Sequence, residues 1–459
     1  MADGKNKNSI DMTTGAILPK LLVTTLPLMA SSVLQLLFNA ADVVVVGNFA
    51  SEHSLAAVGS TGALVNLITN LFIGLSIGAN SLASFYFGAR DVKNLSKTAH
   101  NAILLSALGG AALTVIGVVF AEKFLIWMQT PDEVLGLGST YITVYFAGSI
   151  PVLVFNFGSS LLRAKGDTKR PLYYLTVAGL INVVLNLIFV IVFKMDVAGV
   201  ALATVIAQTI SAYLVMRCLV RETDEFRIEW SKLKDGFDGA IVLEILRIGI
   251  PAGIQGIVFS LSNVVIQSSI NGFGPIVMAG SAAAQNVEGF VWVSMNAFAQ
   301  TVLTFVSQNV GARKYDRIKP IMIITLVCSA LTGVILGNLC DIFSAPLVRI
   351  FDQRPEVVNA GVVRFSLVCR YYFLCGLMDV MVGVLRGMGY SVTPTVVSLL
   401  GACGLRLLWI FTVFQIPSFH TEFMLFLSYP LSWIVTFLIH VLCYAAIRRR
   451  WAKLRVAVA

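Results

Sequence analysis

Long apolar segments recur along almost the whole chain, and they constrain its fold more than any other feature. Of 459 residues, 57% are hydrophobic and only 12% are charged, whereas soluble domains carry about a quarter charged residues. Segments of about twenty apolar residues can cross the roughly 30 Å hydrocarbon core of a bilayer. In lipid, such segments must be helices or strands of a closed barrel, because backbone groups have no water to bond. They lack the alternating pattern of barrel strands, which predicts an all-α integral membrane protein.

Twelve spans are predicted, six in each half of the chain. In the first half they cover residues 18–48, 55–86, 98–121, 137–162, 171–193 and 197–220. In the second half they cover residues 241–270, 276–309, 318–340, 357–386, 393–416 and 423–447. The longest charged stretch inside the chain is 221–239. We therefore expect an N-terminal six-helix lobe at 1–220, a cytoplasmic linker at 221–239 and a C-terminal six-helix lobe at 240–459.

Basic residues gather in alternate loops. Lys and Arg follow the second, fourth, eighth and twelfth spans and fill the linker, whereas the loops 48–54, 271–275 and 417–421 contain neither. The loop near Arg349 and Arg354 is an exception to this pattern. Positive loops stay in the cytoplasm, so we expect a multi-pass protein of the plasma (inner) membrane with both termini cytoplasmic. These loops explain the net charge of +9, and no nucleic-acid partner is expected. The polar residues 1–14 lack the pattern of a cleaved signal peptide.

The two halves repeat one another. Gly88-Ala89-Arg90 after the second span returns as Gly311-Ala312-Arg313 after the eighth, an offset of 311 − 88 = 223 residues. Pro27 in the first span and Pro251 in the seventh are 251 − 27 = 224 residues apart. Because each half has an even number of spans, both halves enter the membrane from the same side. Such parallel halves are typical of transporters and predict two pseudo-symmetric lobes around a central cavity.

The ordered set of motifs resembles the multidrug and toxic compound extrusion (MATE) transporters over nearly the whole chain. The set comprises the paired Gly-Ala-Arg loops, Pro27 and Asp42 in the first span with Gly47 shortly after Asp42, LRAKGDTKRP at 162–171 and NVVLN at 182–186. The resemblance implies export of bulky, cationic drugs or toxic metabolites by alternating access. It also implies that an inward flow of protons or sodium ions drives this export, without a cofactor.

Asp42 is the strongest candidate for coupling. It lies roughly 33 Å of helix beyond Lys20, in the outward half of the membrane. A carboxylate there costs several kcal/mol unless it is solvated, paired or protonated. Such a group can exchange a proton for a cationic ligand, as an antiporter requires. The alternative is a hydrated residue at the outer interface.

Asn182 and Asn186 are four residues apart and share one face of the fifth span, and Thr204 lies in the sixth. The chain is more similar to the DinF-like branch of the family. In that branch an Asp of the first span, two polar or acidic residues and a Thr form a site in the N-terminal lobe. The resemblance therefore implies a coupling site of Asp42, Asn182, Asn186 and Thr204. The alternative role of the Asn pair is hydrogen bonding between helices.

The coupling ion is predicted to be a proton rather than sodium. Some members of the family carry Asp where this chain has Asn186, so a single carboxylate remains here. Hard cations prefer charged oxygens, which weakens a sodium site. The sodium-coupled branch also places an acid in the seventh span, where this chain offers only Gln255.

Further polar residues inside spans are predicted to line the substrate cavity. Intramembrane ionisable groups are functional candidates by default, and Pro27 is a candidate helix kink because proline removes a backbone donor. The alternative for the charged members is a structural cluster in which Glu288 or Asp379 neutralises Arg406. The predicted cavity residues are Gln35, Asn156, Glu288, Asp379 and Arg406.

Other functions fit less well. A flippase for a lipid-linked oligosaccharide needs several intramembrane basic residues for the pyrophosphate, and only Arg406 and Arg370 qualify. The four histidines have no metal-ligand spacing, and neither a GxSxG motif nor a P-loop occurs. We therefore expect no enzyme, no bound metal and a monomer in the bilayer.

Overall fold

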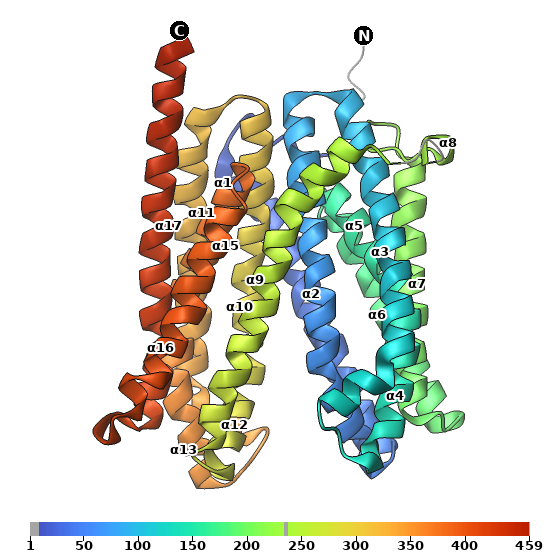
Figure 1. The fold of residues 1–459 in the computed structure, drawn as a ribbon, viewed down its shortest axis with the longest axis vertical. Helices are drawn as coiled ribbons and strands as arrows, with labels where there is room; N and C mark the ends of the chain where they lie inside the picture. The colour runs from blue at the N-terminus through green and yellow to red at the C-terminus, as the bar shows by residue number, and fades with distance from the viewer. Residues whose placement is uncertain (1–8, 234–236, 459) are drawn as a thin grey trace. The chain divides into compact units, whose positions relative to one another are not determined.

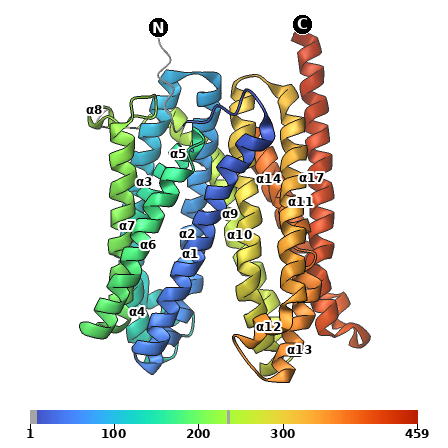
Figure 2. The ribbon, with the colours of Figure 1, turned by 180° about the vertical axis from the view of Figure 1, so that it is seen from behind.

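The computed structural model describes residues 9–233 and 237–458, and no β-strand occurs in these ranges. The first half contains α1 (Ile17–Phe49), α2 (Glu52–Ala89), α3 (Val92–Trp127), α4 (Asp132–Ala147), α5 (Ser149–Ala164), α6 (Lys169–Leu187), the π-helical turn η1 (Ile188–Val192) and α7 (Asp196–Arg221). The short helix α8 (Trp230–Leu233) lies in the predicted linker. Within this half the long helices run side by side (Figures 1 and 2).

The second half repeats this order with more interruptions. It contains α9 (Gly239–Asn271), α10 (Pro275–Gly311), η2 (Tyr315–Arg317), α11 (Ile318–Ile342), α12 (Ser344–Arg349), α13 (Pro355–Arg364), η3 (Phe365–Cys369), α14 (Phe373–Gly387), α15 (Val392–Ser398), η4 (Leu399–Gly404), α16 (Leu405–Phe411), η5 (Val413–Gln415), η6 (Pro417–Phe419) and α17 (Glu422–Val458). Of the short elements, η3 and η4 are π-helical.

The number of spans agrees with the prediction. Ten helical segments of the described chain are long and apolar enough to cross a membrane, and two bent pairs bring the number to 12. The pairs are α4–α5, bent by 48°, and α13–η3 with α14, bent by 41°. The first bend lies at Gly148, and 148 + 223 = 371 falls in the second break, so the bend is part of the repeat. The prediction of an all-α, twelve-span membrane protein is confirmed.

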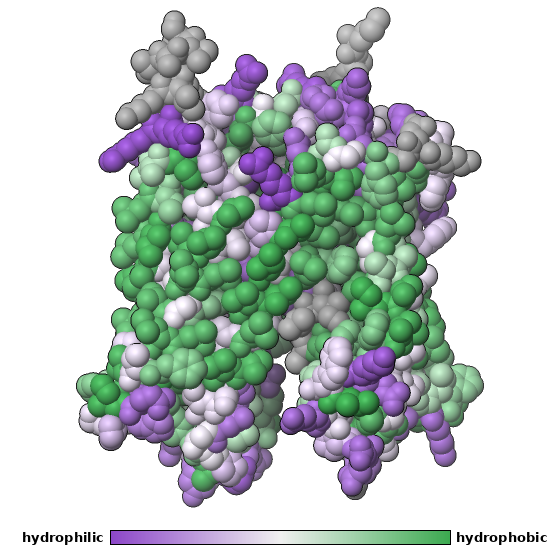
Figure 3. All heavy atoms as spheres, in the orientation of Figure 1, coloured by the Kyte–Doolittle hydropathy of each residue, from purple (hydrophilic) through white to green (hydrophobic). Residues whose placement is uncertain are grey.

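The outer surface has the polarity that a bilayer requires. On the face drawn in Figure 3, hydrophobic residues cover the middle of the helices, and hydrophilic residues gather at their ends. Large apolar side chains are exposed along the spans, among them Leu180, Leu243 and Leu442. In lipid such exposure costs nothing, because the acyl chains are as apolar as leucine.

The chain forms two compact units, and the first helix of each half begins in one unit and continues in the other. Unit 1 comprises the segment ending at Gly15, Leu26–Gly253 and Gly311–Arg313. Unit 2 comprises Ala16–Thr25, Ile254–Val310 and the chain from Lys314 onward. The start of α1 therefore belongs to unit 2, and the start of α9 belongs to unit 1. The predicted lobes at 1–220 and 240–459 follow the repeat, and their boundaries stay a prediction.

Two pairs of glycines bring α2 and the start of α9 into backbone contact within unit 1. Gly74 and Gly78 on α2 face Gly249 and Gly253 on α9. A Cβ atom on Gly249 would lie 2.6 Å from the Leu75 Cα, closer than any side chain tolerates. Small residues four apart allow this close approach of helices in membranes.

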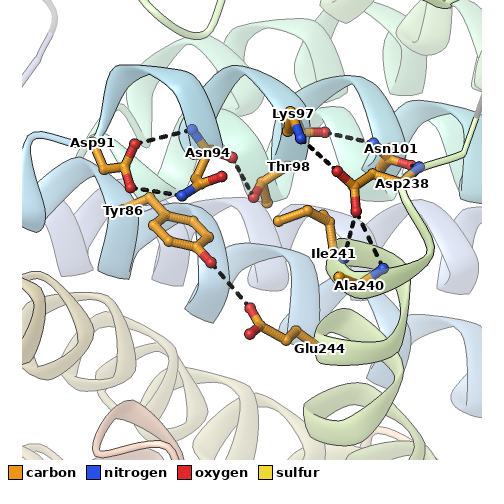
Figure 4. A network of polar contacts seen from close by, with 10 residues as sticks. All are labelled: Tyr86, Asp91, Asn94, Lys97, Thr98, Asn101, Asp238, Ala240, Ile241 and Glu244. Atoms are coloured by element: carbon orange, nitrogen blue, oxygen red, sulfur yellow. Dashed lines mark hydrogen bonds and ion pairs between the residues drawn. The ribbon is translucent and has the colours of Figure 1, made fainter. Parts of the chain in front are cut away.

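Hydrogen bonds attach the linker to unit 1 (Figure 4). Lys97 of α3 pairs with Asp238 at an N–O distance of 2.6 Å, and the Asn101 side chain accepts a bond from the Asp238 backbone amide at 2.9 Å. The Asp238 carboxylate also accepts bonds from the first amides of α9. One turn further, the Tyr86 hydroxyl donates to Glu244. The end of the linker thereby fixes where α9 begins.

A fully buried lysine forms ion pairs with the N-terminal end of the linker. Lys165, in the loop before α6, pairs with Glu222 at 2.9 Å and with Asp224 at 3.0 Å. Arg170 bridges Glu222, at 2.5 Å, and Asp167. A buried charge is tolerated only when it is paired and hydrogen-bonded, so these residues act as one structural unit.

We expect Gly249→Ala to lower the stability of the protein by about 1–3 kcal/mol, because the new methyl group must push apart the backbones of α2 and α9. The same change at Gly136, where a Cβ meets nothing within 4 Å, is the matched control. Thermal unfolding in detergent measures both variants. An equal midpoint for the two would contradict the packing described here.

The pH dependence of stability tests the Lys165 cluster. Burial would raise the pKa of Glu222, but Lys165 and Arg170 lower it more, so its pKa in the folded protein lies below the ordinary 4.5. Such a group stabilises the fold fully above about pH 4.5, and this contribution is lost as the pH falls through the lower, folded value. Glu222→Gln should therefore lower the unfolding midpoint at neutral pH, and the difference from the native protein should shrink in acid. A difference that is constant with pH would refute the assignment.

Candidate polar site in the first unit

The four residues predicted as a coupling site lie together in unit 1. The Asn186 Nδ2 on α6 donates to the Asp42 Oδ1 on α1 at 2.5 Å and lies 3.3 Å from the Asn182 Oδ1. The Asn182 Nδ2 donates to the Thr204 Oγ1 on α7 at 3.2 Å. A chain of side-chain hydrogen bonds thus joins three helices of the first half.

A close contact between α1 and α6 positions this site. Phe38 lies one turn before Asp42, and its ring covers Gly179, which lies one turn before Asn182 on α6. A side chain at position 179 would overlap the ring. The missing Cβ lets α1 approach α6 closely enough for Asp42 to reach Asn186.

The site is partly buried and partly accessible. Asn182 and Asn186 are buried, whereas Asp42 and Thr204 are partly exposed. The Asn186 Oδ1 is buried and has no hydrogen-bond partner in the described chain. A buried polar atom without a partner is rare in proteins. This oxygen can accept a bond from a ligand, a water molecule or a protonated acid.

The C-terminal candidates are arranged differently from the prediction. Glu288 on α10 forms a two-pronged ion pair with Arg364 on α13, with both N–O distances 2.7 Å. Arg364 also donates to Ser281 at 2.6 Å. The hypothesis that Glu288 neutralises Arg406 is wrong, because Arg364 takes up its charge. The spacing of residues in the sequence could not identify Arg364 as the partner of Glu288. The one signal in the sequence was that Arg364 lies inside the predicted span 357–386.

Arg406 lies among aromatic rings instead. Its guanidinium is 4.2 Å from the Tyr429 ring centroid and 5.3 Å from that of Trp433, and its Nε donates to Ser432 at 2.8 Å. The residue is 4% exposed, and its Nη2 has no hydrogen-bond partner among the described residues. Cation–π contacts and one hydroxyl stabilise this charge.

Asp379 belongs to a third group in unit 2. Its carboxylate lies within reach of the Asn296 and Trp292 side chains and in the electrostatic range of Arg386. Arg386 in turn donates to the Gln255 Oε1 at 2.8 Å. Gln255 of the seventh predicted span therefore belongs to the same group as Asp379.

The remaining predicted residues make few contacts. Gln35 on α1 is exposed, and Asn156 on α5 donates to a carbonyl of its own helix, that of Val152, at 2.8 Å. Pro27 lies inside α1, two residues after the last residue that α1 contributes to unit 2. Their assignment to a substrate cavity or a kink stays a prediction.

Three π-helical turns adjoin polar residues of these groups. η1 begins two residues after Asn186, η3 begins directly after Arg364, and η4 ends two residues before Arg406. Such turns are frequent at functional sites, because they rotate the helix beyond them. No signal in the sequence marked them.

A polar site among membrane-spanning helices, in a chain built from two parallel repeats, is typical of secondary transporters. The chain belongs to the MatE family: the family model matches residues 27–188 and again residues 251–412. The two matches start 251 − 27 = 224 residues apart, in agreement with the repeat predicted from the sequence. The family is one of membrane transporters and not of enzymes, and most of the relatives are named multidrug resistance or export proteins.

Relatives and solved structures agree with this assignment. The probable multidrug resistance proteins YpnP and YoeA of Bacillus subtilis are each 26% identical to the chain; the alignments cover 86% and 94% of it and 88% and 93% of the relatives. The crystal structure of a MATE in complex with MaL6 covers 99% of both chains, with a TM-score of 0.89 at 18% identity. The Vibrio cholerae MATE transporter VcmN in its bent form gives 0.86 at 20%, covering 94% of this chain and 97% of its own.

A double-mutant cycle tests whether Glu288 is structural. Glu288→Met and Arg364→Met should each cost about 3–5 kcal/mol of stability, because each leaves a buried charge without a partner. The double variant should recover most of this loss in thermal unfolding. If it also keeps transport, the pair is structural; if it is stable but inactive, the pair acts in coupling.

Proposed function

We propose that this protein exports small organic compounds from the cytoplasm across the plasma membrane in exchange for protons. Both termini lie in the cytoplasm, as the distribution of basic loops predicts. The observation that carries the proposal is the hydrogen bond between Asp42 and Asn186. The Asp42 carboxylate has no ion-pair partner among the described residues, and it lies on α1, one of the candidate spans.

Asn186 suits a carboxyl group that changes its protonation state. An amide offers both donors and an acceptor, so its NH₂ can donate to the Asp42 carboxylate and its oxygen can accept from the protonated acid. An aspartate at position 186 would repel the ionised form and favour a metal cation. This difference supports protons over sodium as the coupling ion.

The transport cycle follows from this switch. Asp42 takes a proton from the outside, substrate leaves, and the protein then opens to the inside. There Asp42 releases its proton, and a cationic substrate then binds and supplies the positive charge that the proton had carried. Pro27 and Pro251 are the candidate hinges, since proline weakens a helix where it interrupts the hydrogen-bond ladder. The chamber between the halves stays a prediction.

Bulky organic cations are the proposed substrates. The names of the relatives support this breadth: YpnP is a probable multidrug resistance protein, and MepA of Staphylococcus aureus, 21% identical, is a multidrug export protein. The lipid-linked oligosaccharide flippase is less well supported. Arg364 is neutralised by Glu288, and Arg386 is bonded to Gln255 near Asp379. Few intramembrane cations are left for a pyrophosphate.

We expect Asp42→Asn to abolish proton-driven efflux of an organic cation dye from proteoliposomes, since the amide cannot take up a proton. The matched control is Asp132→Asn, which removes an exposed carboxylate at the start of α4. Imposing a pH gradient and a sodium gradient one at a time identifies the coupling ion. Undiminished efflux by Asp42→Asn would reject the role of Asp42, and efflux driven only by sodium would reject the proton.

A further inference from the structure

A basic pocket of about 410 Å³ lies at the end of unit 1 where α6 begins and α7 ends. Its walls include the guanidinium groups of Arg170, Arg217 and Arg221, together with Tyr174 and Cys218. The carboxylate of Glu222 also borders it. None of these residues belongs to the Asp42 site, and the proposed export does not use them.

The pocket carries uncompensated positive charge. Lys165 and Arg170 are paired with Glu222, Asp224 and Asp167, so the uncompensated charge is that of Arg217 and Arg221. Arg217 and Arg221 are exposed and have no ion-pair or hydrogen-bond partner in the described ranges. The Arg170 Nη2 is buried and also has no hydrogen-bond partner there. Two unpaired guanidinium groups beside one hollow suit a phosphate, which accepts bonds from several such donors.

The surroundings place the pocket at the level of lipid headgroups. Tyr213 lies one turn before Arg217 on the same face of α7 and is 62% exposed. Tyr173, close to the start of α6, is 60% exposed. Exposed tyrosines mark the interface between water and hydrocarbon in membrane proteins. The pocket therefore lies where the phosphates of a bilayer lie.

An apolar stripe runs from the pocket along α6. Val177, Leu180 and Val184 follow Tyr173 at spacings of three and four residues, and all three side chains are exposed. Such a stripe offers a surface to acyl chains in line with the phosphate. The position of the pocket at headgroup level favours a lipid phosphate over a soluble one, and the stripe, like the outer surface of the other spans, accommodates the acyl chains.

We propose that this pocket binds the headgroup phosphate of an anionic phospholipid whose acyl chains lie along α6. Arg217 and Arg221 compensate the charge of the lipid, and Arg170 keeps the neighbouring Glu222 in an ion pair. Basic pockets between spans on the cytoplasmic side bind anionic headgroups in other membrane proteins. The inference rests on the proposed orientation only for the choice of leaflet.

Lipid titration of the purified protein in detergent tests the proposal by native mass spectrometry. Phosphatidylglycerol should bind more tightly than phosphatidylcholine. Arg217→Gln with Arg221→Gln should weaken phosphatidylglycerol binding by about tenfold or more, on the order expected for two arginines near an anionic surface. The matched control, Arg449→Gln with Arg450→Gln, removes the same charge from exposed positions of α17.

Three outcomes would overturn the proposal. The first is equal binding of the two lipids, and the second is an equal loss in the control variant, which indicates attraction by overall charge. The third is displacement of the lipid by glycerol phosphate at matched concentration, which identifies a soluble ligand. Dye efflux by the Arg217 and Arg221 variant separates this test from that of the export function, because the proposal requires only a change in lipid binding.

Discussion

The structure depends on one constraint: inside the bilayer, each polar group must find its partner within the chain. Water is absent there, and an unpaired charge costs several kcal/mol. Glu288 meets this constraint through two bonds to Arg364, and Arg406 meets it through aromatic faces and one hydroxyl. Asp42 is bonded to an amide in place of a cation. A carboxylate in such a setting stays ready to gain a proton or a cation.

The two halves share a fold but not a charge pattern. The repeat reproduces the spans, the bends at Gly148 and 371, and the prolines near the start of each half. In unit 1 the carboxylate of Asp42 forms no ion pair within the described chain. In unit 2 two acids, Glu288 and Asp379, lie among three buried arginines. One half of the repeat thus holds an acid that is hydrogen-bonded to an amide, while the other holds acids close to buried arginines.

Much of this architecture could be predicted from the sequence, because hydropathy and loop charge act over many residues. Eleven of the twelve predicted spans end within six residues of the observed helices, and only α17 extends further, to Val458 against a predicted end at 447. The pairing of Asp42 with the Asn182 and Asn186 face was expected from the family resemblance. The pairing of Glu288 with Arg364 was not predicted. Which side chain meets another depends on how each helix is rotated. The π-helical turns beside Arg364 and Arg406 change this rotation without a mark in the composition.

Pro27 and Pro251 lie within three residues of the points at which α1 and α9 pass from one compact unit to the other. Each of these helices starts in one compact unit and ends in the other, so it connects the two units mechanically. Any rotation of one unit against the other must twist or bend such a helix. The helix bends most easily at the proline, because a backbone hydrogen bond is missing there. Movement would then reach Asp42, fifteen residues along α1 from Pro27 (42 − 27), as a change in the angle of its own helix.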